Sequence, residues 1–198
     1  RFFDDGRFHF FLLFSLSIPL NIGYAILKTV YGFVLHSNWI VQNGVYYALL
    51  TLMRFIIIRG AEKNEEDKAL KLSSIILSIS SFHYLLMVLE MYLHTSSPHY
   101  PGYIVYAASL YAFIKVGVVI KGCVKVKTTA TPAIVAGNNL KISHAFVSLI
   151  FLESGMLNIF GEGKEDERLI LLISGLVVVA YLFVSGPLLI VLNKRNKV

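Results

Sequence analysis

Long apolar runs separated by short polar connections make up most of this chain. A transmembrane helix needs about 17–25 predominantly apolar residues, and six stretches of the sequence reach that length. The pattern therefore predicts an all-α integral membrane protein with six transmembrane helices in a single domain, residues 1–198. The predicted helices cover about residues 8–35, 39–59, 70–93, 102–122, 142–160 and 168–192.

Basic residues gather in every second connection between the predicted helices. The connections that follow the second and fourth helices are rich in lysine, and the tail reads NKRNKV, whereas HSN, HTSSPHYPG and GEGKEDER are not basic. Loops rich in Lys and Arg stay on the cytoplasmic side of a membrane. Both termini are therefore predicted to be cytoplasmic. The chain starts at Arg1 without a signal peptide, and we expect it to be a fragment of a longer protein.

The composition agrees with a membrane location. Hydrophobic residues make up 56% of the chain and charged residues 15%, and the mean hydropathy is +0.68, whereas soluble domains contain about 25% charged residues. The net charge of +6 comes from helix ends and loops, so the bilayer is the expected partner and nucleic acid is not. Cys123 is the one cysteine, which excludes an internal disulfide and a CxxC motif. We expect a multi-pass protein of a bacterial plasma membrane.

Several polar residues fall at membrane depth, where a charge costs about 2.5–3.5 kcal/mol on insertion scales. Lys28 lies in the outer half of the first predicted helix, and Glu153 lies near the centre of the fifth. The two residues either pair across helices or line a path for a solute. The full set of candidates for this polar path or buried pairing is Lys28, Asn43, Tyr46, Asn138, His144 and Glu153.

His83, Glu90 and Lys115 are secondary candidates. His83 and Glu90 share one face of the third predicted helix, but a separation of seven residues places them about 10 Å apart along the axis. They cannot ligate one ion together without further groups. Arg54, Glu90 and Lys115 are expected to extend toward the nearer membrane surface, as long charged side chains do near helix ends.

Motifs for covalent or metal-dependent catalysis are absent from the sequence. It contains no HExxH, no GxSxG and no Gly-rich phosphate loop. We predict that the protein is not an enzyme, and the sequence names no cofactor and no metal site.

The first predicted hairpin carries Asn21, Lys28, Gly32 and Ser37 at intervals of seven, four and five residues. This spacing resembles the first helical hairpin of the cation diffusion facilitator (cation efflux) family. The segments YAASLYAFIKV and TPAIVAGNNLKISHAFVSL resemble the fourth and fifth helices of the same family. The resemblance implies a six-helix bundle with both termini cytoplasmic. The chain is also similar to bacterial multi-pass proteins of unassigned function with a YA..K...G pattern.

The resemblance does not extend to the metal ligands. In the family, helices two and five each supply two His or Asp residues, four apart, to a zinc site. Those positions fall here on Tyr46 and Leu50 and on Leu140 and His144, and two further family Asp positions fall on Asn43 and Gly137. A zinc ion requires about four N, S or O ligands, and His144 alone could coordinate it. The resemblance therefore implies a cation-efflux scaffold with a degenerate metal site.

Three functions stay open on the sequence alone. The first is a transport-related or membrane interaction module, acting alone, as a homodimer or in a larger membrane assembly. The second is a divergent divalent-cation transporter with a relocated site that uses His83, Glu90, His144 or Glu153. The third is a solute-binding subunit of an importer.

Overall fold

The described part of the protein is helical throughout. The computed structural model describes residues 5–34, 36–93, 106, 109–110, 112–114, 116–117, 119–120, 131–161 and 165–195, and these residues contain no strand. The long helices are α1 (Asp5–Val34), α2 (Asn38–Glu62), α3 (Glu66–Leu93), α5 (Pro132–Phe160) and α6 (Glu165–Arg195).

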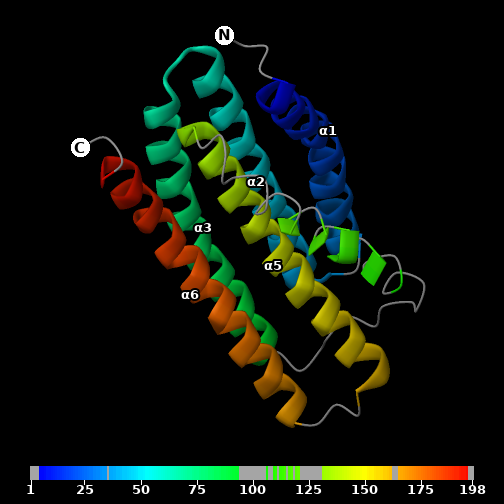
Figure 1. Cartoon of the computed structure of the whole chain (residues 1–198). Coiled ribbons are helices and arrows are strands. Elements are labelled where there is room, and N and C mark those ends of the chain that lie inside the picture. Colours follow the sequence, from blue (N-terminus) through cyan, green and yellow to red (C-terminus); the bar gives the residue numbers. More distant parts are fainter. Residues whose placement is uncertain are drawn as a thin grey trace.

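The helices lie side by side as a bundle (Figure 1). The turn between α2 and α3, the start of α5 and the end of α6 meet at one end of it. At this end a carboxylate oxygen of Glu66 accepts the backbone N–H of Ala133 at 3.2 Å, and Asn193 Nδ2 donates to Asp67 Oδ1 at 2.9 Å. The first turn of α3 thus holds both the start of α5 and the end of α6.

Among the described residues, four helical stretches are long and apolar enough to cross a membrane: Asn38–Glu62, Glu66–Leu93, Pro132–Leu157 and Asp166–Val191. This agrees with a multi-pass membrane protein, while the count of six spans and the cytoplasmic termini stay predictions. The predicted helix over residues 102–122 falls mostly outside the described residues, and so does Lys115. The residues that are described between 106 and 120 are helical, and among them Ala112 is buried in the core.

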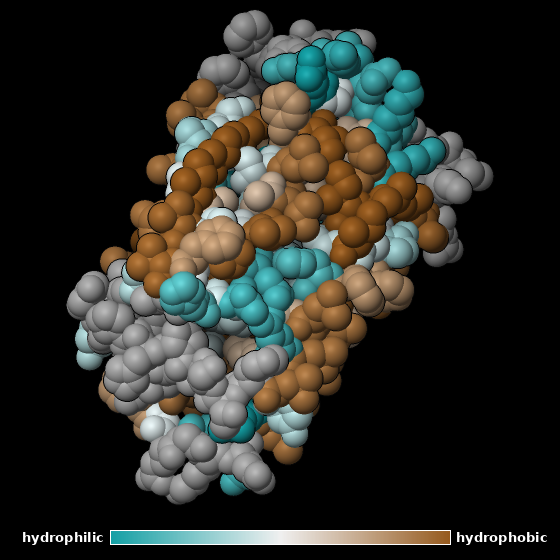
Figure 2. All heavy atoms as spheres, turned by 180° about the vertical axis from the view of Figure 1, so that it is seen from behind, coloured by the Kyte–Doolittle hydropathy of each residue, from teal (hydrophilic) through white to brown (hydrophobic). Residues whose placement is uncertain are grey.

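The outer surface of the helices is apolar. On the face in Figure 2, hydrophobic side chains cover most of the length of the helices, and hydrophilic side chains gather at the upper end and in a lower patch. The exposed apolar side chains include Leu20, Phe33, Ile79, Phe82 and Val177. Such a surface suits contact with lipid better than contact with water.

The start of the fifth helix was misplaced by the apolar pattern. It was predicted near residue 142, but α5 begins at Pro132. Proline is favoured in the first helical turn because its missing N–H has no partner there anyway, and Thr131 precedes it with extended backbone. The additional turns are rich in Ala, Asn and Gly, so they interrupt the apolar run without interrupting the helix.

The predicted tight turn between the first two helices is present. It contains His36 with a positive φ of 51°, and Ser37 N–H donates to the carbonyl of Gly32 at 2.9 Å. α2 then lies between α1, α3 and α5, and its buried side chains face more than one neighbour. Those in the core are Trp39, Ile40, Tyr46, Leu50, Met53, Ile57 and Ala61.

Small residues let neighbouring helices approach closely, as they do in membrane bundles. A Cβ added at Gly44 of α2 would meet Thr29 Oγ1 and lie 3.0 Å from the carbonyl oxygen of Ala25, both on α1. A Cβ added at Gly186 of α6 would lie 2.6 Å from the carbonyl oxygen of Ser74 on α3. The α1–α2 and α3–α6 pairs therefore both depend on glycine at the contact.

Gly44→Ala should lower the melting temperature of the purified protein, because overpacking a tight contact costs about 1–3 kcal/mol. The matched control is Gly23→Ala on α1, where an added Cβ meets nothing within 4 Å and alanine favours the helix. Thermal melts in one detergent compare the two. Equal melting temperatures would show that the α1–α2 contact can relax.

Candidate functional site

Lys28 of α1 is buried at the junction of α1, α2 and α5. Its side chain is 5% exposed, and its Nζ donates a hydrogen bond of 2.8 Å to Asn43 Oδ1 on α2. Asn43 is itself 1% exposed. Two of the predicted polar residues, distant by 15 positions in the sequence, are thus brought into direct contact.

Three aromatic rings surround the Lys28 ammonium. Its Nζ lies 3.6 Å from the ring centroid of Phe151 and 4.8 Å from those of Tyr24 and Tyr47. The negative face of an aromatic ring attracts a cation within about 6 Å, most strongly where water is excluded. We call Tyr24, Asn43, Tyr47 and Phe151 the Lys28 cage. It draws one ring from each of α1, α2 and α5.

The partner that the sequence suggested for Lys28 is not the one it has. No ion pair joins Lys28 and Glu153 in the described part of the chain, and Glu153 is only partly buried. Within that part, the Lys28 ammonium contacts an amide oxygen and aromatic faces but no carboxylate. Its charge is therefore stabilised by neutral groups.

Arg54 forms a second buried cationic contact further along α2. The expectation that it extends to the membrane surface is wrong, because Arg54 is 2% exposed. Its Nη1 donates to Ser17 Oγ of α1 at 2.6 Å, and its Nη2 lies 3.1 Å from His144 Nδ1 of α5. A guanidinium can only donate, so His144 Nδ1 accepts and a neutral imidazole carries its proton on Nε2.

Tyr47 connects these two cations. Its ring meets the His144 ring edge-on at 4.9 Å, and its hydroxyl lies 3.4 Å from Ser148 Oγ. Ser148 Oγ donates to the carbonyl of His144 at 2.8 Å. A continuous row of polar and aromatic groups thus runs between α1, α2 and α5. We call this row, from the Lys28 cage through Tyr47 to His144 and Arg54, the cationic seam.

A second polar group lies between α2, α3 and α5. Tyr46 and Tyr84 have no exposed surface, and their ring centroids are 5.6 Å apart. Within the described chain, neither hydroxyl has a hydrogen-bond partner. Glu153 lies close enough to Tyr84 to act on it electrostatically. Glu153 thus acts on Tyr84, and no hydrogen bond or ion pair joins it to Lys28 in the described chain.

His83 and Glu90 both contact Gln42 of α2. His83 Nε2 donates to the backbone carbonyl of Gln42 at 3.1 Å, and Gln42 Nε2 donates to a carboxylate oxygen of Glu90. In the described ranges, no three His, Cys, Asp or Glu side chains converge in a way that could hold a metal ion. The residues considered for a relocated metal site therefore have different partners. His83 and Glu90 contact Gln42, His144 contacts Arg54, and Glu153 acts on Tyr84.

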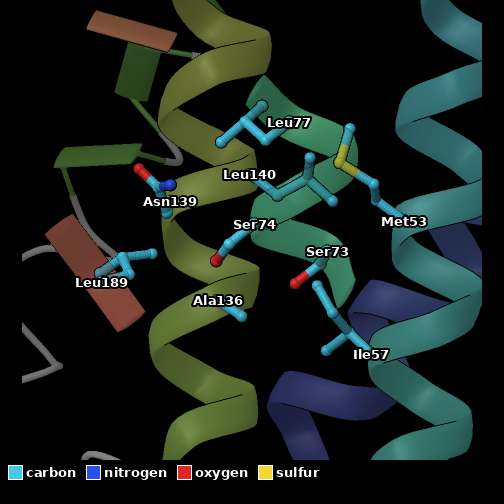
Figure 3. A pocket seen from close by; sticks show the side chains of 9 residues that line it. All are labelled: Met53, Ile57, Ser73, Ser74, Leu77, Ala136, Asn139, Leu140 and Leu189. Carbon is cyan, nitrogen blue, oxygen red and sulfur yellow. The ribbon is translucent and has the colours of Figure 1, made fainter. Parts of the chain in front are cut away.

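Of the two neighbouring asparagines of α5, it is Asn139, and not the predicted Asn138, that hydrogen-bonds to α6. Asn139 Oδ1 accepts from the Tyr181 hydroxyl of α6 at 2.7 Å, while Asn138 is only partly buried. Asn139 also lines a small hollow of about 10 Å³ where α2, α3, α5 and α6 meet. Figure 3 shows its lining, with Ser73 and Ser74 extending from α3. A volume of about 10–15 Å³ holds roughly one water molecule, which is too little for an organic solute.

Sequence reasoning found the residues at the two ends of the seam but missed what joins them. Lys28, Asn43 and His144 were identified because polar residues are rare at membrane depth. Tyr24, Tyr47 and Phe151 gave no comparable signal, since aromatic residues are common in apolar helices. Tyr24 precedes Lys28 by four residues and Tyr47 follows Asn43 by four, so helical spacing placed both rings on the faces that carry the polar pair.

Comparison with known proteins adds no relative. No protein-family model matches the chain, no curated protein matches it, and no solved structure matches it. The geometry of the seam is therefore the basis on which a function can be proposed.

Lys28→Met should lower the melting temperature. The change removes the ammonium and leaves the buried Asn43 amide oxygen unpaired, which costs about 1–3 kcal/mol. Lys63→Met, at an exposed lysine that follows α2, is the matched control and should melt like the parent protein. An unchanged melting temperature for Lys28→Met would mean that the cage contributes nothing to stability.

Proposed function

We propose that this protein is a transport-related, multi-pass protein of a bacterial plasma membrane, with a cation-efflux-like six-helix bundle and both termini cytoplasmic. Its working part is the cationic seam, and it does not use a zinc site of the family type. The observation that carries this proposal is the buried Lys28 ammonium, which contacts Asn43 and three rings at the α1–α2–α5 junction.

The depth of the seam supports a functional role. Ionisable residues within membrane helices are expensive and commonly mark solute or ion pathways. Here Lys28, His144 and Arg54 follow one another along the same helix junction. A purely structural junction between apolar helices needs no such row, because small and apolar side chains suffice.

The seam is closed off from the surface in the described conformation, since Lys28, Tyr47 and Arg54 are each at most 5% exposed. The central hollow has room for roughly one water molecule. The groove of about 490 Å³ between α3 and α6 is open and is lined mainly by apolar residues such as Ile79, Phe82 and Ile190, so it faces lipid. Because buried side chains fill the seam, movement of a solute along it requires α1 or α5 to separate from α2. The Lys28 cage, which holds groups from all three helices, is the contact that such a movement breaks.

The residues at the family's ligand positions argue against a zinc transporter of the cation-efflux type. Tyr46, Leu50 and Leu140 occupy the ligand positions that the resemblance implies, and they are buried in the apolar core. His144 could still coordinate a metal, but its Nδ1 accepts from the Arg54 guanidinium. The charge of Arg54 opposes a divalent cation at that place.

The alternatives have less support. A relocated divalent site would have to combine His83, Glu90, His144 or Glu153, which contact different partners. An importer subunit or an interaction module, acting as a homodimer or in a larger assembly, fits the apolar surface, but it does not explain buried cations. A role as an enzyme, or in binding nucleic acid, is not part of the proposal.

Calorimetric titration of the purified protein with zinc or manganese should give no saturable heat at micromolar metal. Arg54 beside His144 and the dispersed acids leave no group of ligands for either ion within the described ranges. His144→Ala and His83→Ala should give the same flat titration as the parent protein. Saturable binding that either substitution removes would establish a relocated metal site.

Proteoliposomes on a solid-supported membrane allow transport to be tested before the solute is identified. We expect a transient current on exchange to one class in a panel of amine, carboxylate and phosphate solutes. Glu153→Gln should change that current by several-fold and leave the melting temperature unaltered, because it removes a charge that acts on the buried Tyr84 and keeps the size of the side chain. Glu65→Gln, in the exposed turn before α3, is the control. The absence of a current with every solute of the panel would contradict transport. A Glu153→Gln current equal to that of the parent protein would show that Glu153 is not part of the path.

A further inference from the structure

The Lys28 cage has the composition of a site that recognises an ammonium ion. Three ring faces and one amide oxygen surround the cation, with the ring of Phe151 closest at 3.6 Å. Aromatic faces with a hydrogen-bond acceptor are the recognition elements for protonated amines. The ring quadrupoles repel anions, and a divalent metal ion needs several oxygen, nitrogen or sulfur ligands that the cage does not offer.

The walls of the cage are held by contacts other than those with Lys28. Tyr24 and Tyr47 meet edge-on at 4.9 Å, and Phe151 stacks on Trp39 of α2 at 5.2 Å. Tyr47 also packs against His144. Since each ring is fixed by a neighbour, the cage should keep its shape when the lysine side chain is removed.

The Asn43 side chain gives a separate indication that the cage is arranged around a cation. Its Oδ1 accepts from Lys28, while its Nδ2, although buried, has no hydrogen-bond partner in the described chain. A buried amide with an unpaired donor costs about 1–3 kcal/mol. The amide oxygen of Asn43, and not its amide nitrogen, therefore contacts the centre of the cage, where the Lys28 ammonium donates a hydrogen bond.

From these contacts we infer that the cage is a binding site for a primary ammonium ion, which the side chain of Lys28 fills in the intact protein. Lys28 is a tethered occupant of the site. The free ligand class is a small primary alkylammonium ion, which takes the same place when the tethered one is absent. This inference does not depend on transport, because binding is measured on the purified protein.

The test is chemical rescue of Lys28→Ala. This change removes three methylene groups and the ammonium, which together correspond to n-propylammonium. The variant should melt at a lower temperature than the parent protein. Adding n-propylammonium chloride should restore about half of the loss or more, with the concentration dependence of ligand binding to the folded state. Methylammonium should restore less, since it leaves part of the space empty.

The controls separate ammonium recognition from filling of a cavity and from general salt effects. 1-Propanol, which has the same size but no charge, and sodium acetate should restore little. The parent protein and Lys28→Met should not respond to n-propylammonium, because a side chain still fills the cage. Leu50→Ala should not respond either, because its cavity lies at the fully buried Leu50 and not in the cage. Equal rescue by 1-propanol, or no rescue of folded Lys28→Ala, would overturn the inference.

A double-mutant cycle gives an answer if Lys28→Ala does not fold. Lys28→Met and Phe151→Leu each keep most of the side-chain volume. If Phe151 recognises the ammonium, the loss of melting temperature in the double variant should be clearly smaller than the sum of the single losses. Phe151→Tyr keeps a ring face and should melt close to the parent protein. Strictly additive losses would mean that Phe151 does not recognise the Lys28 charge, which would overturn the inference.

Discussion

The α1–α2–α5 junction depends on how the buried positive charge of Lys28 is stabilised without a negative one. Placing a lysine at membrane depth costs about 2.5–3.5 kcal/mol on insertion scales. Each cation–π contact returns about 0.5–2 kcal/mol, and a hydrogen bond to a charged group returns about 1.5–3 kcal/mol. Three rings and the Asn43 amide around Lys28 are therefore of the right order to offset the cost. The position of α1 against α2 and α5 follows from this requirement.

α2 separates two regions of different chemistry. Toward α1 and α5 it presents Asn43, Tyr47 and Arg54, which contact Lys28 and His144. Toward α3 it presents Gln42 and Tyr46, which meet Glu90 and Tyr84. Cationic groups thus lie on one side of the helix and acidic groups on the other. Rotation of α2 about its axis would turn the side chains that face α1 and α5 toward α3. The tight contact of Gly44 with α1 opposes such a rotation.

The helical and apolar character of the chain was predictable from the sequence, because the length of its apolar runs follows directly from the thickness of the bilayer. The helical start at Pro132 was missed since polar residues such as Asn138 and Asn139 interrupt the apolar pattern but not the helix. The site was less predictable. Depth along a helix suggested that Arg54 reaches the surface, yet whether it does depends on the neighbouring Ser17 and His144. The depth of a residue along its helix also does not show which neighbouring helix its side chain faces. The sequence therefore could not decide whether Lys28 contacts Asn43 or Glu153.

The short turn at His36 and Ser37 has a consequence for how the protein enters the membrane. Lys28 and Asn43 belong to the same helical hairpin, and Asn43 is made only 15 residues after Lys28. The ammonium and its amide partner, together with Tyr24 and Tyr47, can therefore leave the ribosome as parts of one hairpin. Phe151 arrives much later during synthesis. The charge of Lys28 can thus be partly shielded within the hairpin before α5 is made, and α5 then packs against a hairpin that already holds the charge.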